Sequence, residues 1–282
     1  MRAQVATEQP TVSMANESVR DLIEALKDPI AHNRYEAAMT LRYMASSAPE
    51  PEIRAAVPAL SEAAKESNVR VRRAAVEALG VIGRTERSAV PPLAEALVDS
   101  DVDVRYLAAI SLHYIGPDAD AAVPALTVSL KDSDAKVRSA AAAALRSIGP
   151  SAKAAVPALA GALDDPDLRV QREAASALGA IGPDARTAVP ALVRALRESD
   201  QSVRVFVAGA LGHIGTDTET VVPALIEALK DSSFLVRWSA ADALGTMGAN
   251  ARAAAPALLE ARNDSEPYVR KAAEEALEAI GP

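Results

Sequence analysis

The chain has 282 residues, with 30 Lys and Arg against 38 Asp and Glu, which gives a formal net charge of −8. This acidic balance argues against non-specific binding to nucleic acid, which requires a basic surface. The absence of cysteine excludes disulfides, thiolate zinc sites and cysteine nucleophiles. Apolar stretches stop well short of the roughly 18 residues that a membrane span needs, so we expect a cytoplasmic protein with no membrane insertion.

Residues 1–17 are polar and lack an apolar signal segment, so we expect a flexible N-terminal leader there. From residue 18 to residue 282 we expect one repeat domain. A Val-Pro or Ala-Pro pair recurs every 33 residues, and a Val-Arg pair recurs in step with it. A fixed period of this size predicts stacked copies of one supersecondary unit. The prolines of this column are Pro58, Pro91, Pro124, Pro157, Pro190, Pro223 and Pro256.

Each repeat predicts two helices, as residues 116–149 show best. The first, helix A, begins at the Val-Pro pair, because proline is tolerated in the first turn of a helix. An Asp-Ser-Asp turn follows, and its second Asp is placed to cap the second helix, helix B. A Gly-Pro pair ends helix B, since glycine adopts left-handed backbone conformations and proline cannot continue the helix. The apolar stripes are Val123, Leu126 and Leu130 in helix A, and Val137, Ala141, Leu145 and Ile148 in helix B.

The pattern changes at both ends of the chain. Leu22, Ile23 and Leu26 predict the first helix A, and an insertion of five residues around residues 46–51 separates that repeat from the next. In the last repeat Arg262 stands at a core position of helix A and the final helix is acidic, so we expect a polar capping repeat. The sequence therefore predicts an all-α fold, an α-solenoid (α-α superhelix) of about eight two-helix repeats.

The repeat unit reads Ala-Val-Pro-Ala-Leu, an Asp-containing turn, Val-Arg, then Ala-Leu-Gly-x-Ile-Gly-Pro. It resembles the short bacterial HEAT-like repeats named after phycobilisome lyase subunits. Residues 155–188 show the likeness well, although Gln171 replaces the Arg. The resemblance covers the chain after residue 17, and it specifies the fold rather than the function, because the same repeat serves scaffolds, chaperones and lyase subunits. Ankyrin repeats share the period, but their Thr-Pro-Leu-His signature is absent.

Two polar columns run through the repeats. An acidic residue stands in every turn, and an Arg follows about one helical turn later in all repeats except the one that carries Gln171. We expect these side chains to form a ladder that ties adjacent repeats, with each exposed pair contributing only about 0.2–1 kcal/mol. The alternative is a charged binding strip. The ladder includes Asp99, Arg105, Asp132, Arg138, Asp231 and Arg237.

The chain has eight aromatic residues, and all of them lie in turns or in helix B. The resemblance implies that helix B lines the concave side of the solenoid. One column directly follows the Arg ladder and lies off the apolar stripe, so we expect it to be partly exposed and to bind a partner. The alternative is that the rings fill gaps between alanine-rich helices. The predicted partner-binding residues are Tyr35, Arg73, Tyr106, Arg172, Phe206, Trp238 and Lys271, of which the cations would bind carboxylates of an acidic peptide or a bilin.

The sequence offers little for catalysis. None of the histidines (His32, His113 and His213) is followed by Glu, so the pattern of HEAT-repeat di-iron hydroxylases is missing. His113 and His213 stand three repeats apart, and we expect both to be polar residues near helix ends. No phosphate loop, nucleophile elbow or zinc spacing occurs. We expect no cofactor, no metal and no catalytic residue in this chain.

Two functions remain open. The first is a non-catalytic scaffold or adaptor that binds a partner protein on its concave helix-B surface. The second, which rests on the family resemblance, is a subunit of an E/F-type phycobilin lyase or a chaperone for bilins and phycobiliproteins, whose partner would be a phycobiliprotein or a second lyase-like chain. A nucleic-acid-binding role is disfavoured by the net charge, although Arg70, Arg72 and Arg73 form one local basic cluster.

Overall fold

A computed structural model describes residues 18–47 and 51–281 of the chain. The predicted leader, residues 1–17, and residues 48–50 of the predicted insertion lie outside the described residues. The chain forms two compact units, one up to Ser111 and one from Leu112 onward, with the boundary inside helix α6. Each unit is described separately below.

In the first unit the helices alternate between helix A and helix B, as the repeat predicted. A short 3₁₀ helix leads into each of the two later repeats, and α2 is longer than the other B helices. The elements are α1 (Val19–Ala25), α2 (Ala31–Ser47), η2 (Pro51–Ala56), α3 (Val57–Ala63), α4 (Val69–Gly83), η3 (Arg87–Ala89), α5 (Val90–Ala96) and α6 (Val102–Ile115).

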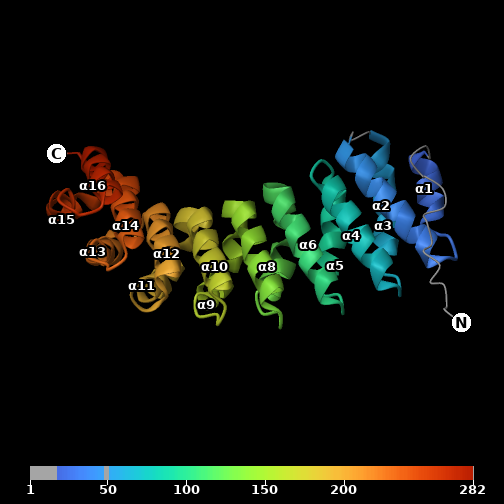
Figure 1. Cartoon of the computed structure of the whole chain (residues 1–282), viewed down its shortest axis with the longest axis horizontal. Coiled ribbons are helices and arrows are strands. Elements are labelled where there is room, and N and C mark those ends of the chain that lie inside the picture. Colours follow the sequence, from blue (N-terminus) through green and yellow to red (C-terminus); the bar gives the residue numbers. More distant parts are fainter. Residues whose placement is uncertain (1–17, 48–50, 282) are drawn as a thin grey trace, which may run out of the picture. The chain divides into compact units, whose positions relative to one another are not determined.

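The second unit continues the same alternation, and its helix pairs lie side by side in chain order (Figure 1). The described residues thus form the all-α solenoid that the sequence predicted, with eight helix pairs. None of the described helices is both long enough and apolar enough to cross a membrane. The elements are η4 (Gly116–Ala122), α7 (Val123–Ser129), α8 (Ala135–Ile148), η5 (Gly149–Ala155), α9 (Val156–Ala162), α10 (Leu168–Ile181), η6 (Gly182–Ala188), α11 (Val189–Glu198), α12 (Gln201–Ile214), α13 (Thr218–Ala228), α14 (Phe234–Met247), η7 (Gly248–Ala254), α15 (Ala255–Ala261) and α16 (Pro267–Ile280).

Local sequence signals set the ends of the helices. Pro124 lies in the first turn of α7, and the Asp134 side chain accepts a hydrogen bond from Lys136 N at the start of α8. Gly149 ends α8 with φ +69°, a conformation that a residue with a side chain rarely adopts. The Gly-Pro link that follows is not an open turn but a 3₁₀ helix, η5, which carries the chain to the next helix A.

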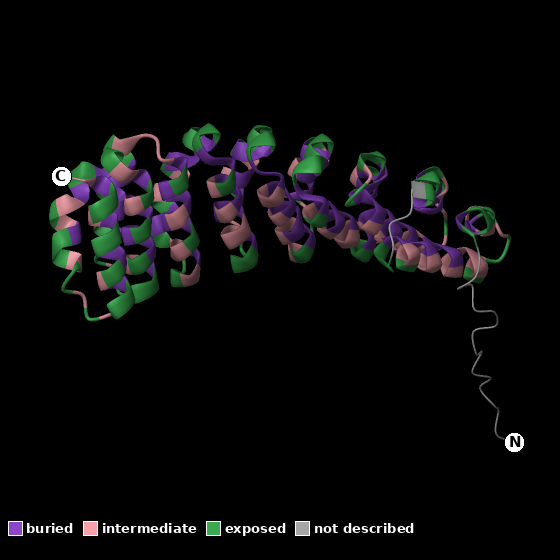
Figure 2. Ribbon diagram, turned by 90° about the horizontal axis from the view of Figure 1, so that it is seen from above, coloured by how far each residue is buried: buried purple, intermediate pink, exposed green. Residues whose placement is uncertain are grey.

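Neighbouring B helices in the second unit approach each other closely because small residues meet between them. A Cβ atom placed on Gly212 of α12 would lie 2.7 Å from the Cα atom of Ala243 on α14. Gly179 of α10 meets Ala210 of α12 at 3.0 Å in the same way. Buried residues run where the two helices of each pair face each other, and exposed residues occupy the outward sides (Figure 2). Alanine and glycine therefore set the spacing between repeats.

A ladder of ion pairs joins consecutive turns within each unit. In the pairs named below, the guanidinium donates to one or two carbonyl oxygens of its own turn and binds a carboxylate in the turn of the next repeat. Arg138, for example, donates to Asp132 O and Ser133 O. Its Nε lies 2.7 Å from Asp165 Oδ2, and both side chains are largely buried. Arg105 likewise donates to the carbonyl oxygens of Asp99 and Ser100. The ion pairs of this ladder include Arg34–Glu66, Arg72–Asp99, Arg138–Asp165, Arg204–Asp231 and Arg237–Asp264.

In the second unit, one pair of consecutive turns among the described residues lacks the ion pair of this ladder. Gln171 stands in the Arg column of α10, and its Nε2 donates to Asp165 O at 2.6 Å. Its Oε1 is buried without a hydrogen-bond partner among the described residues, and Glu198, which occupies the acidic position of the next turn, is exposed. The contact between α10 and α12 therefore lacks the bidentate pair that its neighbours have. Since the stability of a solenoid is approximately a sum of terms between neighbouring repeats, this joint is weakened.

Candidate functional site

The predicted aromatic column is partly exposed in both units. Tyr35 and Tyr106 of the first unit are half-buried. In the second unit the side chains of Phe206 and Trp238 are 43% and 39% exposed. Both rings expose apolar surface to solvent. Soluble monomers rarely expose large apolar patches, and such patches often mark binding sites.

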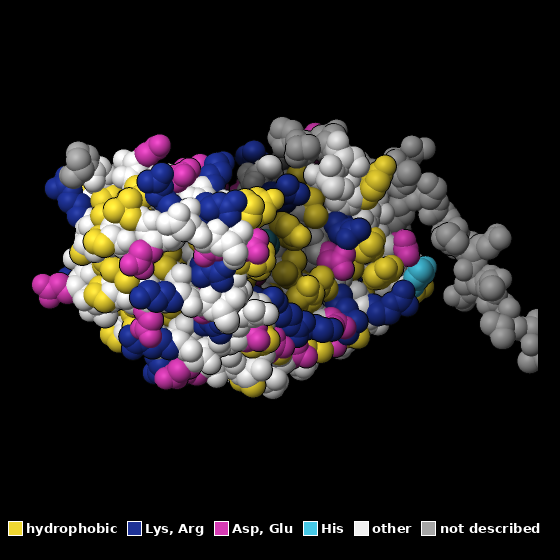
Figure 3. Space-filling model, turned by 60° about the vertical axis from the view of Figure 1, so that its left-hand side comes forward, with side chains coloured by type: hydrophobic (Ala, Val, Ile, Leu, Met, Phe, Trp, Pro, Cys, Tyr) yellow, Lys and Arg dark blue, Asp and Glu magenta, His cyan; other side chains and the backbone are white. Residues whose placement is uncertain are grey.

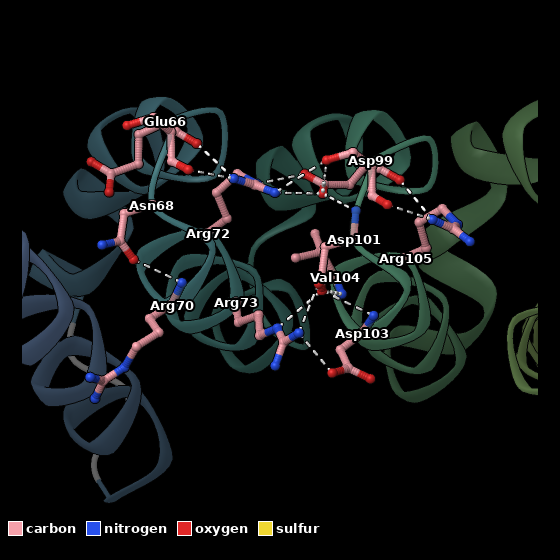
Figure 4. Close-up of polar contacts among 12 residues, drawn as sticks. Glu66, Asn68, Arg70, Arg72, Arg73, Asp99, Asp101, Asp103, Val104 and Arg105 are labelled. Carbon is pink, nitrogen blue, oxygen red and sulfur yellow. Dashed lines mark hydrogen bonds and ion pairs between the residues drawn. The ribbon is translucent and has the colours of Figure 1, made fainter.

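In the first unit the cations near this column already have partners within the chain. The Arg70 guanidinium lies 4.8 Å from the centre of the Tyr35 ring. Arg73 donates to Asp101 at 2.8 and 3.0 Å and lies 2.8 Å from Asp103 Oδ2. Figure 4 shows Arg72 between the turns of Glu66 and Asp99, and Arg73 directed at Asp101 and Asp103. Two members of the local basic cluster, Arg72 and Arg73, are therefore paired with neighbouring carboxylates, and Arg73, expected to bind a partner's carboxylate, binds two of this chain.

The second unit carries a groove that crosses the B helices α8, α10, α12 and α14. It has a volume of about 400 Å³, and most of its surface is apolar. We call it the aromatic groove, because the exposed rings of Phe206 and Trp238 border it. Its floor is made of glycine and alanine. The residues that define it are Gly179, Val205, Phe206, Gly209, His213 and Trp238.

The polar atoms at the edge of the aromatic groove are largely occupied by the protein itself. Ser239 Oγ donates to Val205 O at 2.8 Å, and Ser176 Oγ donates to Arg172 O at 2.9 Å. His213 Nδ1 lies 2.8 Å from Gly209 O, an arrangement in which the ring nitrogen donates. The floor of the groove therefore offers mainly apolar contact to a ligand.

The cations of the predicted site differ in what they contact. Lys271 Nζ lies 3.4 Å from Glu275 on the same helix, and both are exposed. Arg146, at one end of the aromatic groove, lies 3.4 Å from Glu173. Arg172 lies one turn before Ser176 on α10, and its guanidinium has neither a hydrogen bond nor an ion pair with any residue of ranges 18–47 and 51–281. The pKa of Asp200 is lowered by its hydrogen bonds with Ser202 and also by the nearby charge of Arg172. Arg172 is thus the predicted site residue best placed to bind an external carboxylate.

Sequence reasoning missed several residues of the aromatic groove, among them Arg146, Gly209 and His213. His213 was expected to be only a polar residue near a helix end, and Gly209 was not singled out at all. One signal was available in the repeat, since Gly209 replaces the Ser176 and Asp242 of the neighbouring repeats. A residue without a side chain, in a column of otherwise larger residues, marks a depression.

Charge is mixed over the surface. Lys and Arg side chains lie among Asp and Glu side chains over most of the face in Figure 3, with hydrophobic side chains between them. Within the part of the chain that the structure describes, no group of three or more His, Asp or Glu residues is arranged to hold a metal ion. The chemistry of the aromatic groove is therefore that of apolar contact beside a cation.

Comparisons with known proteins agree with the fold. HEAT repeats match residues 19–113, 90–179, 123–199 and 189–278. The crystal structure of an engineered protein is similar, with a TM-score of 0.64 and 25% identity, over 93% of this chain and 78% of that one. The complex of CpcE and CpcF of phycocyanin lyase from Nostoc sp. PCC7120 gives a TM-score of 0.49 and 25% identity, over 99% of both chains. A comparison with curated protein sequences gives no match. The chain belongs to the HEAT-repeat family.

Proposed function

We propose that this chain is a non-catalytic scaffold that binds a partner protein on the face formed by its B helices. The observation that carries the proposal is the aromatic groove, where Phe206 and Trp238 remain exposed beside an apolar hollow. Exposed aromatic side chains around a depression are typical of binding hot spots, and HEAT repeats are a common framework for protein interaction. The mixed surface charge fits a protein partner better than a polyanion.

A crosslinking experiment tests this proposal. A photoreactive phenylalanine analogue would replace Phe206 in one variant and Leu259, an exposed residue of helix A on α15, in a control variant. After illumination in a lysate of the source organism, mass spectrometry would identify the crosslinked proteins. We expect one partner to crosslink at position 206 and not at position 259, and to be lost when Trp238 and Tyr106 are both changed to Ala. A partner captured equally by both positions would contradict the assignment of the binding face.

The second candidate is a role in handling bilins, as a phycobilin lyase subunit or chaperone. Its support within this chain is the aromatic groove with Arg172 beside it, since a bilin presents a flat apolar ring system and propionate groups. Titration of the protein with phycocyanobilin, followed by absorption and by quenching of Trp238 fluorescence, tests it. Saturable quenching that is weakened in Arg172→Ala, together with a saturable change in bilin absorption that is weakened in Trp238→Ala, would favour this candidate over the scaffold.

A further inference from the structure

The floor of the aromatic groove depends on Gly209. A Cβ atom on this residue would meet only Ser239 Oγ, at 3.8 Å, so helix packing does not require glycine here. Gly212, one turn later on α12, is different, because its Cβ would collide with Ala243 at 2.7–3.0 Å. Glycine within a helix costs about 0.5–1 kcal/mol relative to alanine. At position 209 no close helix contact offsets this loss of stability. The absence of a side chain at Gly209 instead leaves the hollow between Phe206 and His213.

The hollow suits a large apolar side chain. Its hydroxyl groups and the His213 Nδ1 atom are already hydrogen-bonded within the protein, so a polar group inserted there would lose water without gaining partners. Phe206 and Trp238 offer ring surfaces at its border. Aromatic rings pair favourably with other rings and with aliphatic side chains beyond the area they bury. A phenylalanine, tryptophan or leucine side chain therefore matches the aromatic groove.

The positive charge of Arg172, beside the aromatic groove, favours a ligand with an acidic residue next to its large apolar side chain. Arg172 shares a column with Val205 and Trp238, and its guanidinium makes no ion pair with the residues that the structure describes. A guanidinium that is half-buried and unpaired binds carboxylates through charge-assisted hydrogen bonds. The carboxylate beside Arg172 within this chain is Asp200, which is exposed, hydrogen-bonds to Ser202 and makes neither a hydrogen bond nor an ion pair with Arg172. Glu173, the residue after Arg172, contacts Arg146.

From these features we infer that the aromatic groove binds a peptide segment of the partner, that one large apolar side chain of this segment sits over Gly209, and that an adjacent carboxylate of the segment pairs with Arg172. This inference rests on the scaffold proposed above and specifies the chemistry of its partner. Gly209 determines which side chain fits, and Arg172 determines the charge of the neighbouring residue.

The test is a selection of short random peptides displayed on phage against the full chain, followed by a second screen against Gly209→Leu. The added side chain fills the hollow from a partly exposed helix position where a Cβ has room, so we expect folding to be retained. Gly209→Ala, whose methyl group meets only Ser239 Oγ, serves as a milder second variant. Gly161→Leu on α9 is the matched control, because a Cβ there has no atom within 4 Å. Circular dichroism verifies that each variant remains helical.

We expect the peptides that bind the wild type and Gly161→Leu, but not Gly209→Leu, to share an aromatic residue or leucine next to Asp or Glu. Synthetic copies without tryptophan would be titrated against the protein, with Trp238, the single tryptophan, as the fluorescent reporter. Arg172→Ala should weaken their binding about tenfold, the loss of one charge-assisted hydrogen bond. Arg194→Ala on α11 should leave it unchanged, since Arg194 pairs with Asp164 on another face.

Three outcomes would overturn the inference. Selected peptides rich in Lys or Arg would contradict the role of Arg172. Peptides that bind Gly209→Leu as well as the wild type would place their site elsewhere. The absence of any peptide dependent on position 209 would mean that the hollow is not an anchor site. If peptide binding is lost in Trp238→Ala yet kept in Gly209→Leu, the scaffold proposal stands and only the inference about the hollow fails.

Discussion

We predict opposite effects on stability when either of two glycines of α12, Gly209 and Gly212, is replaced by alanine. Gly212→Ala adds a methyl group that would lie 2.7 Å from the Cα atom and 3.0 Å from the carbonyl oxygen of Ala243. These are backbone atoms that cannot rotate away, and carbon atoms prefer a separation of about 3.5–4 Å, so α12 and α14 must move apart by roughly 1 Å. Overpacking of this kind costs about 1–3 kcal/mol, against a helix-propensity gain of about 1 kcal/mol.

Gly209→Ala brings the same propensity gain without the collision, because its Cβ would meet only Ser239 Oγ at 3.8 Å. We expect Gly209→Ala to be stabilised by about 0.5–1 kcal/mol and Gly212→Ala to be destabilised by about 1 kcal/mol, the net of the collision and the propensity gain. The two variants would then differ by roughly 3–8 °C in melting temperature for a unit of this size. Thermal and urea unfolding, both followed by circular dichroism, measure the difference.

The control for this pair is Gly161→Ala, where a Cβ has open space and only the propensity gain should appear. If Gly212→Ala unfolded at or above the temperature of Gly209→Ala, the argument that glycine sets the spacing of α12 and α14 would be refuted.

The other predictions concern the ladder and the core. Gln171→Arg supplies a partner for Glu198 and removes a buried amide oxygen that has no hydrogen-bond partner. We therefore expect the free energy of unfolding, measured from the urea midpoint, to rise by about 1 kcal/mol. An unchanged midpoint would mean that the turn at Glu198 holds its carboxylate out of reach. The Arg237 guanidinium, helped by a backbone N–H, holds the pKa of Asp264 below its ordinary value of 3.8, although burial opposes this. Because the pKa of the folded state is the lower one, this pair stabilises the fold above about pH 4 and loses its contribution as the pH falls further. The stability difference between the wild type and Asp264→Asn, measured by urea unfolding at pH 7 and at pH 3, should therefore shrink at pH 3, and a constant difference would exclude ionisation as its cause. Leu145→Asp places a charge at a fully buried position and should unfold its own repeat and the neighbouring ones, which loss of helical circular dichroism would report.

Much of the fold could be predicted because each repeat carries its own local signals. Pro124 marks the first turn of a helix, Asp134 caps the next, and Gly149 ends it with a positive φ, all within one repeat. These signals act over a few residues and recur with the same spacing, so they predict helix ends throughout the chain. The 3₁₀ helix after each Gly-Pro link was not predicted, because a Gly-Pro pair is equally compatible with an open turn.

The candidate site was predictable only in outline. The aromatic column follows from the period, and Phe206 and Trp238 are indeed exposed. The period does not show which cations are already neutralised, since Arg73 and Arg172 occupy the same column. Arg73 meets Asp101 and Asp103 of the next turn, whereas Asp200, which stands at the position of Asp101 in the turn after Arg172, caps α12 through Ser202 N and makes no ion pair with Arg172. Pairing depends on where a neighbouring repeat places its side chains, and that is a property of the packed structure.

The sequence by itself determined the repeat, its two helices, the direction of the apolar stripes and the columns of charge, because these depend on spacing along one chain. Only the tertiary structure decided which glycines pack and which leave a hollow. Gly209 and Gly212 are identical in the sequence and belong to the same helix, but Gly212 faces the backbone of α14 and Gly209 faces solvent beside Phe206. The physical reason is that a depression is formed by atoms of several helices, and their distances are set when the helices pack.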